Sequence, residues 1–437
     1  MINDELQQES TDVLQRLIRF NTVNPPGNER EAIEYLADYL KAAGFETEIL
    51  GPSGQRANLV ATLNGNQPGQ TLCFLGHVDT VLADPDDWEH DPWSGDVADG
   101  FLWGRGALDM KSQVAAEAVA GAALANEGWR PEKGTLKLVF VADEETGGEL
   151  GARWITQNHP DKVRCDLLLN EGAGQTFQIG DRRLYGVCCG EKGVFRFNLD
   201  ARGTAGHASM PKTGDNALLK LGPVIERLAS RQPSFDVTDG PRAMLESLGY
   251  DPGDPQQALD EIAESDPALL IFVAPMFGVT LTPTMAHASD KINVIPARAR
   301  LRIDCRVPPG NGEELARERI AEVLGAQADT LELEFTERHP GNSSRPDTEL
   351  MSEIDAWVRD NDPGAHTVPV ILPGFSDSTW FRKAFPGLTA YGFFPQRHQS
   401  LLEAGPLIHS ANERIDVRDL GFATQFYRDI ARRLLGG

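Results

Sequence analysis

The sequence predicts an α/β protein in which a small α+β domain is inserted into a larger α/β domain. Apolar helical stripes alternate with short apolar strands over the first 170 residues, a pattern typical of helices packed on a largely parallel sheet. The composition shifts near residue 191, where a strand–helix–strand–strand–helix–strand rhythm begins, and the first pattern resumes after residue 340. We therefore predict one domain from residues 1–191 plus 341–437 and an inserted domain from residues 192–340.

The amino-terminal part begins with two amphipathic helices. The first, at residues 4–20, carries an apolar stripe from Leu6 to Ile18, and the second ends at Gly44. The loop at 81–103 is long enough to be functional. Around it the pattern predicts strands at 45–50, 57–63 and 71–76, a helix at 111–126, a strand at 134–142, a helix at 149–156 and a strand at 166–170.

The same apolar patterns predict the elements of the inserted domain and of the carboxyl-terminal part. Residues 232–275, rich in Pro, Gly and Asp, read as an extra surface insertion without an assigned role. The inserted domain is expected to have strands at 194–200, 297–306 and 331–337 and helices at 215–229 and 312–325. After residue 340 we expect a helix at 347–360, strands at 367–372 and 388–393, a loop at 395–416 and a final helix.

Charge and composition exclude several classes of protein. The chain of 437 residues carries a net charge of −24, which argues against nucleic acid or an anionic membrane as a partner. No apolar run approaches the ~20 residues of a membrane-spanning helix, and residues 1–5 lack the features of a signal peptide. The five cysteines are scattered without CxxC spacing, so we expect reduced thiols in a cytoplasmic protein.

A histidine and an aspartate stand together at the end of one buried strand. His77 and Asp79 close the apolar run 71–76, and residues two apart in a strand point to the same side. Open α/β sheets bind their ligands at the carboxyl ends of such strands. A carboxylate beside an imidazole sets its tautomer and raises its basicity, which suits a metal ligand.

Acidic side chains follow the next two strands of this sheet. Strand 134–142 runs into Asp143, Glu144 and Glu145, and strand 166–170 runs into Glu171. The ends of parallel strands lie side by side, so we expect these acids to meet His77. Clustered carboxylates at a buried edge are unfavourable unless a positive group neutralises them, although a solvated acidic turn is the alternative interpretation.

Two further candidates lie in loops. Asp109 directly precedes an Ala-rich helix, where it is either an N-cap residue or a carboxylate ligand held at the helix start. His409 lies in the last long loop and, by itself, is one of nine histidines.

Seven motifs in order along nearly the whole chain resemble the M20 family of dinuclear zinc amidohydrolases and exopeptidases. The resemblance implies a zinc-exopeptidase-like α/β catalytic domain with an inserted α+β lid that forms a homodimer. The motifs are HVD (77–79), GRGALDMK (104–111), ADEETGG (142–148), NEG (170–172), GTAGHASMP (203–211), KINVIPA (291–297) and HSANER (409–414).

The resemblance implies two metal ions per chain. His77, Asp109 and Glu171 would hold one ion, and His409, Asp109 and Glu145 the other, with Asp109 bridging and followed by a cis peptide. Asp79 would orient His77. Imidazole and carboxylate ligands without a thiolate suit two Zn²⁺, with Co²⁺ or Mn²⁺ as substitutes.

The resemblance also implies roles for residues outside the ligand set. Glu144 would be the general base of amide hydrolysis. His207 would reach the active site of the other subunit and stabilise the oxyanion, while Asn293 and Arg306 would contact the intermediate and the substrate carboxylate. From the residues alone, Arg306 is either a carboxylate ligand or a strand-surface partner of Asp304.

These implications point to a small-molecule substrate, an N-acyl-amino acid or a short peptide, cleaved at the amide next to a free carboxylate. The expected enzyme is therefore a deacylase, carboxypeptidase or dipeptidase. A biosynthetic deacylase of the acetylornithine or succinyl-diaminopimelate type is the alternative. A non-catalytic binding relative would have lost a ligand or the base, and none is lost here. An M28-type metalloaminopeptidase would leave the motifs of the inserted domain unexplained.

Overall fold

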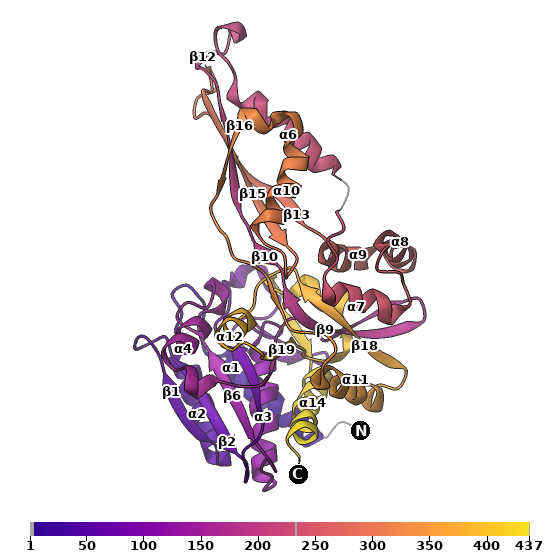
Figure 1. Cartoon of the computed structure of the whole chain (residues 1–437). Helices are drawn as coiled ribbons and strands as arrows, with labels where there is room; N and C mark the ends of the chain where they lie inside the picture. The colour runs from indigo at the N-terminus through magenta and orange to yellow at the C-terminus, as the bar shows by residue number, and fades with distance from the viewer. Residues whose placement is uncertain (1–3, 232–233, 437) are drawn as a thin grey trace.

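The computed structural model describes residues 4–231 and 234–436 and confirms the α/β class (Figure 1). A large sheet has the strand order β1-β2-β6-β3-β7-β19-β9-β8-β20, with β17 and β18 also paired to β9. A smaller sheet has the order β10-β15-β11-β16, with β13 also paired to β15. In the described part of the chain no helix combines the length and apolarity needed to cross a membrane.

The amino-terminal elements match the predicted pattern, except for two short strands inside the predicted loop 81–103 and a short helix at 160–163, which were not predicted. Helix α2 ends at Gly44, whose φ of 102° is the left-handed conformation that glycine adopts most easily. The elements are α1 (Asp4–Ile18), α2 (Arg30–Ala43), β1 (Glu46–Leu50), β2 (Asn58–Asn64), β3 (Thr71–His77), β4 (Val97–Ala98), β5 (Phe101–Trp103), α3 (Lys111–Asn126), β6 (Thr135–Val141), α4 (Ala152–Asn158), α5 (Pro160–Val163) and β7 (Leu167–Asn170).

The centre of the large sheet is parallel, as predicted, the flank of β1 and β2 is antiparallel, and the flank beyond β19 is mixed. Strand β3 lies between β6 and β7 and runs parallel to each of them. The flank beyond β19 (Thr389–Gly392) contains the hairpin of β8 (Gln175–Ile179) and β9 (Arg182–Glu191), which the sequence pattern did not predict. The parallel centre brings the ends of β3, β6 and β7 to one edge.

Helices cover both faces of this sheet. Helix α3 packs against α1 and α14 (Val417–Leu435), and nearly all of its residues are buried. Helices α4 and α12 (Ser378–Ala384) pack together on a separate core with apolar residues of the central strands. Helix α12 and the short elements inside the predicted loop 395–416 were not predicted. The remaining elements are β17 (Asn342–Ser343), α11 (Glu349–Asn361), β18 (Ala365–Leu372), β20 (Gln396–Ser400), α13 (Leu401–Ala404) and β21 (Arg414–Asp416).

The smaller sheet, with two helices, forms what we call the outer unit. It projects away from the large sheet, and β12 (Gly206–His207) with β14 (Val294–Ile295) lies near its far end (Figure 1). Its core is a separate cluster. Strand β13 was not predicted. The elements are β10 (Gly193–Val194), β11 (Phe197–Arg202), α6 (Ala217–Ser230), β13 (Thr280–His287), β15 (Arg298–Val307), α10 (Glu313–Leu324) and β16 (Leu331–Phe335).

Residues 239–277, which we call the inner segment, differ from the surface insertion expected at 232–275, of which residues 232 and 233 lie outside the described part. The inner segment contains α7 (Asp239–Leu248), α8 (Pro255–Ser265), α9 (Leu270–Val273) and a 3₁₀ turn (Ala274–Phe277). Helix α7 packs on β18, and the apolar faces of α7 and α8 are buried in the core of the large sheet. These apolar faces explain why the segment folds inward, onto the large sheet.

Candidate metal centre

The end of β3 places His77 and Asp79 in a buried network. His77 is 1% exposed, and its Nδ1 lies 3.0 Å from the backbone carbonyl of Asp79. A carbonyl only accepts hydrogen bonds, so Nδ1 carries a proton, and Nε2 is the nitrogen that faces Asp109. The Asp79 carboxylate accepts from Asn24 Nδ2 and from the backbone N–H groups of Glu144 and Glu145, at 2.8, 3.1 and 3.2 Å. Asp79 therefore ties the strand end to the acidic turn after β6.

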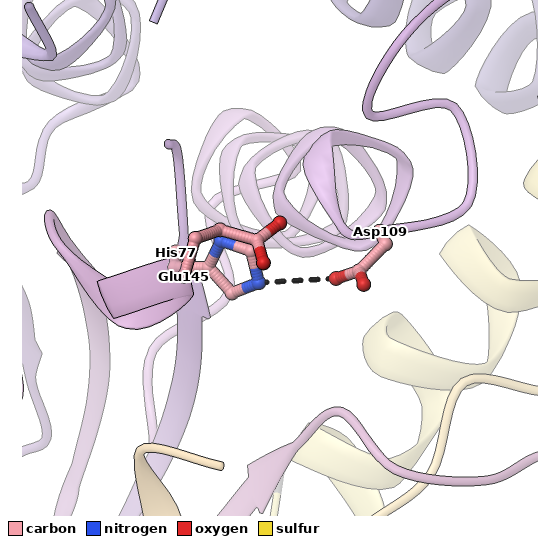
Figure 2. A group of neighbouring side chains, drawn as sticks. All are labelled: His77, Asp109 and Glu145. Carbon is pink, nitrogen blue, oxygen red and sulfur yellow. Dashed lines mark hydrogen bonds and ion pairs between the residues drawn. The ribbon is translucent and has the colours of Figure 1, made fainter. Parts of the chain in front are cut away.

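One carboxylate lies between two imidazoles. Asp109 Oδ1 is 3.1 Å from His77 Nε2, and Asp109 Oδ2 is 2.9 Å from His409 Nε2. Figure 2 shows the Asp109 and Glu145 side chains converging on His77. The two oxygens of Asp109 thus face two different histidines from distant parts of the chain, the arrangement that a bridging ligand requires.

Glu145 and Glu171 complete the group on either side. Glu145 Oε2 is 3.2 Å from His409 Nε2, and Glu171 Oε2 is 3.8 Å from His77 Nε2. Ligand atoms of His77, Asp109 and Glu145 lie within 4.8 Å of one another, as do those of His77, Glu144 and Glu171. The structure therefore brings together all five predicted ligands.

The electrostatics of this group favour a cation. Burial raises the pKa of Glu144 well above its usual value, and burial together with the Asp109 charge raises the pKa of Glu171 to about 7. Hydrogen bonds to Asp109 and Glu145 raise the pKa of His409 to about 10. His409 therefore carries an extra proton at neutral pH, and Glu144 and Glu171 ionise less readily than free carboxyl groups unless other positive charge is present. The donors are nitrogen and oxygen atoms, which suit a divalent metal such as Zn²⁺.

The backbone at this group has unusual conformations. The Asp109–Met110 peptide is cis, as the family resemblance implied. Asp143 and His409 have φ values of 75° and 60°, in the left-handed region that residues other than glycine seldom occupy. Such residues cluster at functional sites.

Sequence reasoning missed two buried acids beside the ligands. Glu413 is fully buried and accepts from the backbone N–H groups of Leu108 and Asp109, at 2.6 and 2.9 Å, and from Arg105 at 2.7 Å. It lies in the HSANER motif but received no role. Asp377 is 1% exposed, and neither of its carboxylate oxygens has a hydrogen-bond partner in the described part of the chain. Its position in the loop after strand 367–372 was the available signal.

The three remaining candidates lie in the outer unit, away from the ligands. His207 is exposed, and its Nδ1 accepts from the backbone N–H of Ser209 at 3.3 Å. The backbone carbonyl of Asn293 accepts from Ala208 N–H, which places Asn293 beside His207 near the end of this unit. Arg306 forms an ion pair of 2.7 Å with Asp304, the partner considered as an alternative.

Three of the five ligands, together with Glu144, line a cavity of about 460 Å³. Asp109, Glu144, Glu171 and His409 line one end of this cavity. The Glu144 carboxylate has no hydrogen-bond or ion-pair partner in the described part of the chain, and it faces the same space as the ligands. Among the acids that line this cavity, Glu144 is thus the one whose carboxylate has no partner in the described part of the chain.

The chain is similar to several known proteins over almost its whole length. It is 29% identical to the succinyl-diaminopimelate desuccinylase of Paracoccus denitrificans, with 96% of each chain covered. It is 26% identical to the enzyme of the same name from Cereibacter sphaeroides, covering 92% of this chain and 93% of that one. An M20 family metallo-carboxypeptidase structure from Sulfolobus solfataricus superposes with a TM-score of 0.72 at 16% identity, covering 97% and 98% of the two chains.

A structure of human carnosine dipeptidase 1 superposes with a TM-score of 0.66 at 16% identity, covering 98% and 96% of the chains. These structural likenesses show the fold. The sequence model of the peptidase family M20/M25/M40 matches residues 73–433, a range that contains every predicted ligand and the whole outer unit. This match confirms the family that the seven motifs indicated. The chain belongs to the peptidase family M20/M25/M40 and is a metal-dependent hydrolase of amide bonds.

Proposed function

We propose that this hydrolase cleaves N-acyl-amino acids or short peptides at the amide next to a free carboxylate. The observation that carries the proposal is the Asp109 carboxylate between His77 and His409, with the unpartnered Glu144 beside it. We further propose a cytoplasmic location, in keeping with the free, buried cysteines.

Two divalent ions, Zn²⁺ or its substitutes Co²⁺ and Mn²⁺, would be held by the five ligands. His77, Asp109 and Glu171 would form one site, and His409, Asp109 and Glu145 the other. When bound, these ions would polarise the amide carbonyl and lower the pKa of the attacking water. Asp79 would keep His77 in the tautomer that presents Nε2, as its hydrogen bond already does.

Glu144 is proposed as the general base and then the general acid. It would take a proton from the attacking water and pass that proton to the nitrogen of the leaving amine. Its raised pKa in the absence of cations reflects burial, and positive charge at the ligands would return it to the carboxylate form that the first step needs.

We propose that the outer unit, which lies within the predicted inserted domain of residues 192–340, acts as the lid and the dimerisation domain, while the inner segment stays on the large sheet. Ser209 N–H donates to Nδ1 of His207, so the imidazole carries its proton on Nε2, from which it could donate to an oxyanion. Helix α6 exposes Leu218, Leu219 and Ile225 (43%, 72% and 40%), an apolar face that suits a second copy of the chain. In a homodimer, His207 and Asn293 would serve the partner's active site.

The substrate carboxylate needs a cation, and Arg306 is the proposed one. Its present partner, Asp304, is on the same strand, so a substrate carboxylate would compete for the same guanidinium. Lid closure would have to bring Arg306 toward the ligands.

A second candidate is a biosynthetic deacylase, because the curated relatives described above are named succinyl-diaminopimelate desuccinylases. The two candidates differ in the acyl group. A desuccinylase must accept an acyl group that itself ends in a carboxylate.

A hydrolysis screen tests the proposal. The metal-loaded protein should cleave N-acyl-amino acids or dipeptides with a free carboxylate, and the matched carboxamides should be poor substrates because they lack the anion. Equal cleavage of acids and carboxamides would contradict the carboxylate requirement. Preference for N-succinyl-diaminopimelate would establish the second candidate.

A further inference from the structure

The cavity beside the ligands continues into an apolar arm. One end holds the acids and His409, and the rest is lined mainly by apolar side chains. These come from separate elements: Phe177 on β8, Phe375 after β18, Phe394 after β19, and Ile271, Phe272 and Met276 of the inner segment. A volume of about 460 Å³ falls in the ordinary range of small-molecule sites, which are mostly apolar with a few polar groups.

The inner segment is a fixed wall of this arm. Helix α7 lies close enough to the sheet that a Cβ on Gly240 would be 2.9 Å from Cys189 Sγ. Lys192 Nζ donates to the carbonyls of Pro275 and Gly278, at 2.8 and 2.7 Å, which anchors the end of the segment. Met276 is 3% exposed, whereas Ile271 is 72% exposed. The segment therefore contributes both a buried wall and an apolar rim.

The charge of the lining decides which chemistry the arm accepts. Among the described residues that line the cavity there is no Lys or Arg, and the charged groups at the ligand end include Asp109, Glu144 and Glu171. A carboxylate placed in the apolar arm would lose its hydration without gaining a cation. The arm is therefore unsuited to an anionic group such as a succinyl chain.

The same charge pattern assigns the two halves of the substrate. In an N-acyl-amino acid, the amine half carries the free carboxylate and the acyl half does not. The half that carries the carboxylate must bind near a cation, and the arm has none. The acyl half is therefore the part of the substrate that binds in the arm.

We infer that the apolar arm is an acyl-binding pocket, built in part by the inner segment, and that the substrate carries a long aliphatic or aromatic acyl group. This inference rests on the proposed hydrolysis of N-acyl-amino acids. Each methylene buried in such a pocket raises kcat/KM roughly four-fold.

An acyl-chain series on one amino acid tests the inference. The kcat/KM of the metal-loaded enzyme should rise from N-acetyl through N-hexanoyl to N-decanoyl, and N-succinyl should be poorest. A kcat/KM that does not change with chain length, or that is highest for the acetyl or succinyl substrate, would contradict the acyl-binding pocket. Amide hydrolysis would still be established.

Two exposed positions provide a matched pair of variants. Ile271→Asp places a charge at the rim and should lower kcat/KM for N-decanoyl about ten-fold, with N-acetyl changed less than two-fold. Leu82→Asp makes the same change at a residue that is 67% exposed and outside the lining, and it should leave both rates unchanged. Equal effects of Ile271→Asp on both substrates would overturn the assignment.

A binding measurement separates the inference from the proposed reaction. Calorimetry with the Glu144→Gln protein should show N-decanoyl-amino acid binding at least ten-fold more tightly than N-acetyl, with a negative heat-capacity change. If no substrate is turned over and this preference persists, the proposed reaction fails and the pocket stands. Equal affinities would overturn the pocket.

Discussion

The metal centre and the outer unit differ in how complete they are within one chain. All five predicted ligands lie within a few ångströms of one another in a single chain, the shortest contact being 2.9 Å from Asp109 to His409. His207 and Asn293, by contrast, are exposed near the far end of the outer unit and contact none of these ligands. Parallel strand ends determine the first arrangement, whereas in the proposed mechanism closure or a second subunit would supply the second.

This difference separates two kinds of functional residue. Residues at the ends of β3, β6 and β7 are held by the central sheet, whose strands are buried on both faces. Residues of the outer unit are carried by a separate core. We therefore expect changes at the centre to act within a chain and changes at the outer unit to act between chains.

The largest effect is expected from Asp109→Ala. The substitution removes the carboxylate between His77 and His409, so both ions should be lost and turnover should fall below detection. Metal analysis of the purified protein measures this, with Asp181→Ala in the exposed β8–β9 turn as the control. Two ions still bound per chain would contradict the bridge.

Glu144→Gln should separate chemistry from metal binding. The amide keeps the size of the side chain but cannot accept the proton, so kcat should fall about 10²–10⁴-fold while both ions remain bound. The exposed Glu149 is the matched control for the same substitution. Activity within a few-fold of the unaltered enzyme would show that another base operates.

His207→Ala tests whether the outer unit acts on the partner's site. Loss of an oxyanion donor should lower kcat about 10²–10³-fold. Mixing this variant with Glu144→Gln should restore activity, because one site of the mixed dimer has Glu144 from one chain and His207 from the other. Confirmed subunit exchange without recovery would place the role of His207 within its own chain.

A smaller effect is expected at Glu413, which positions Asp109. Glu413→Gln replaces an acceptor by an amide that turns a donor toward the N–H groups of Leu108 or Asp109. Metal affinity should weaken about 10–100-fold, measured by competition with a chelator. Unchanged affinity would show that Asp109 is held in place by other contacts.

The smallest expected effect is the dependence of metal affinity on pH. In the metal-free protein His409 has a pKa raised to about 10 by Asp109 and Glu145, and the pKa of His77 is raised well above its usual value by Asp109 and Asp79 despite its burial. His409 therefore carries at pH 7 a proton that ligation must displace, and the pKa of His77 is shifted in the same direction, so apparent metal affinity should rise with pH. Calorimetry in buffers of different ionisation enthalpy should detect proton release, and its absence would contradict these pKa shifts.

Most of the central fold followed from local patterns. Helices α1, α2 and α3 and strands β3, β6 and β7 lie within a few residues of their predicted positions. The hairpin β8–β9 was not predicted, nor were α12 and strand β13. The inner segment resisted prediction because Pro, Gly and Asp broke its pattern, whereas its buried faces appear only against β18.

By itself, the sequence determined the α/β class, the seven motifs and the residue types of the metal centre, because a strand ending in His77 or Glu171 is a local property of a few residues. Tertiary structure decided the rest. The position of Asp109 between two histidines, the support from Glu413 and the apolar arm formed by β8, β18 and the inner segment all depend on packing between distant segments. Those contacts are set by how buried faces fit together, which no local pattern encodes.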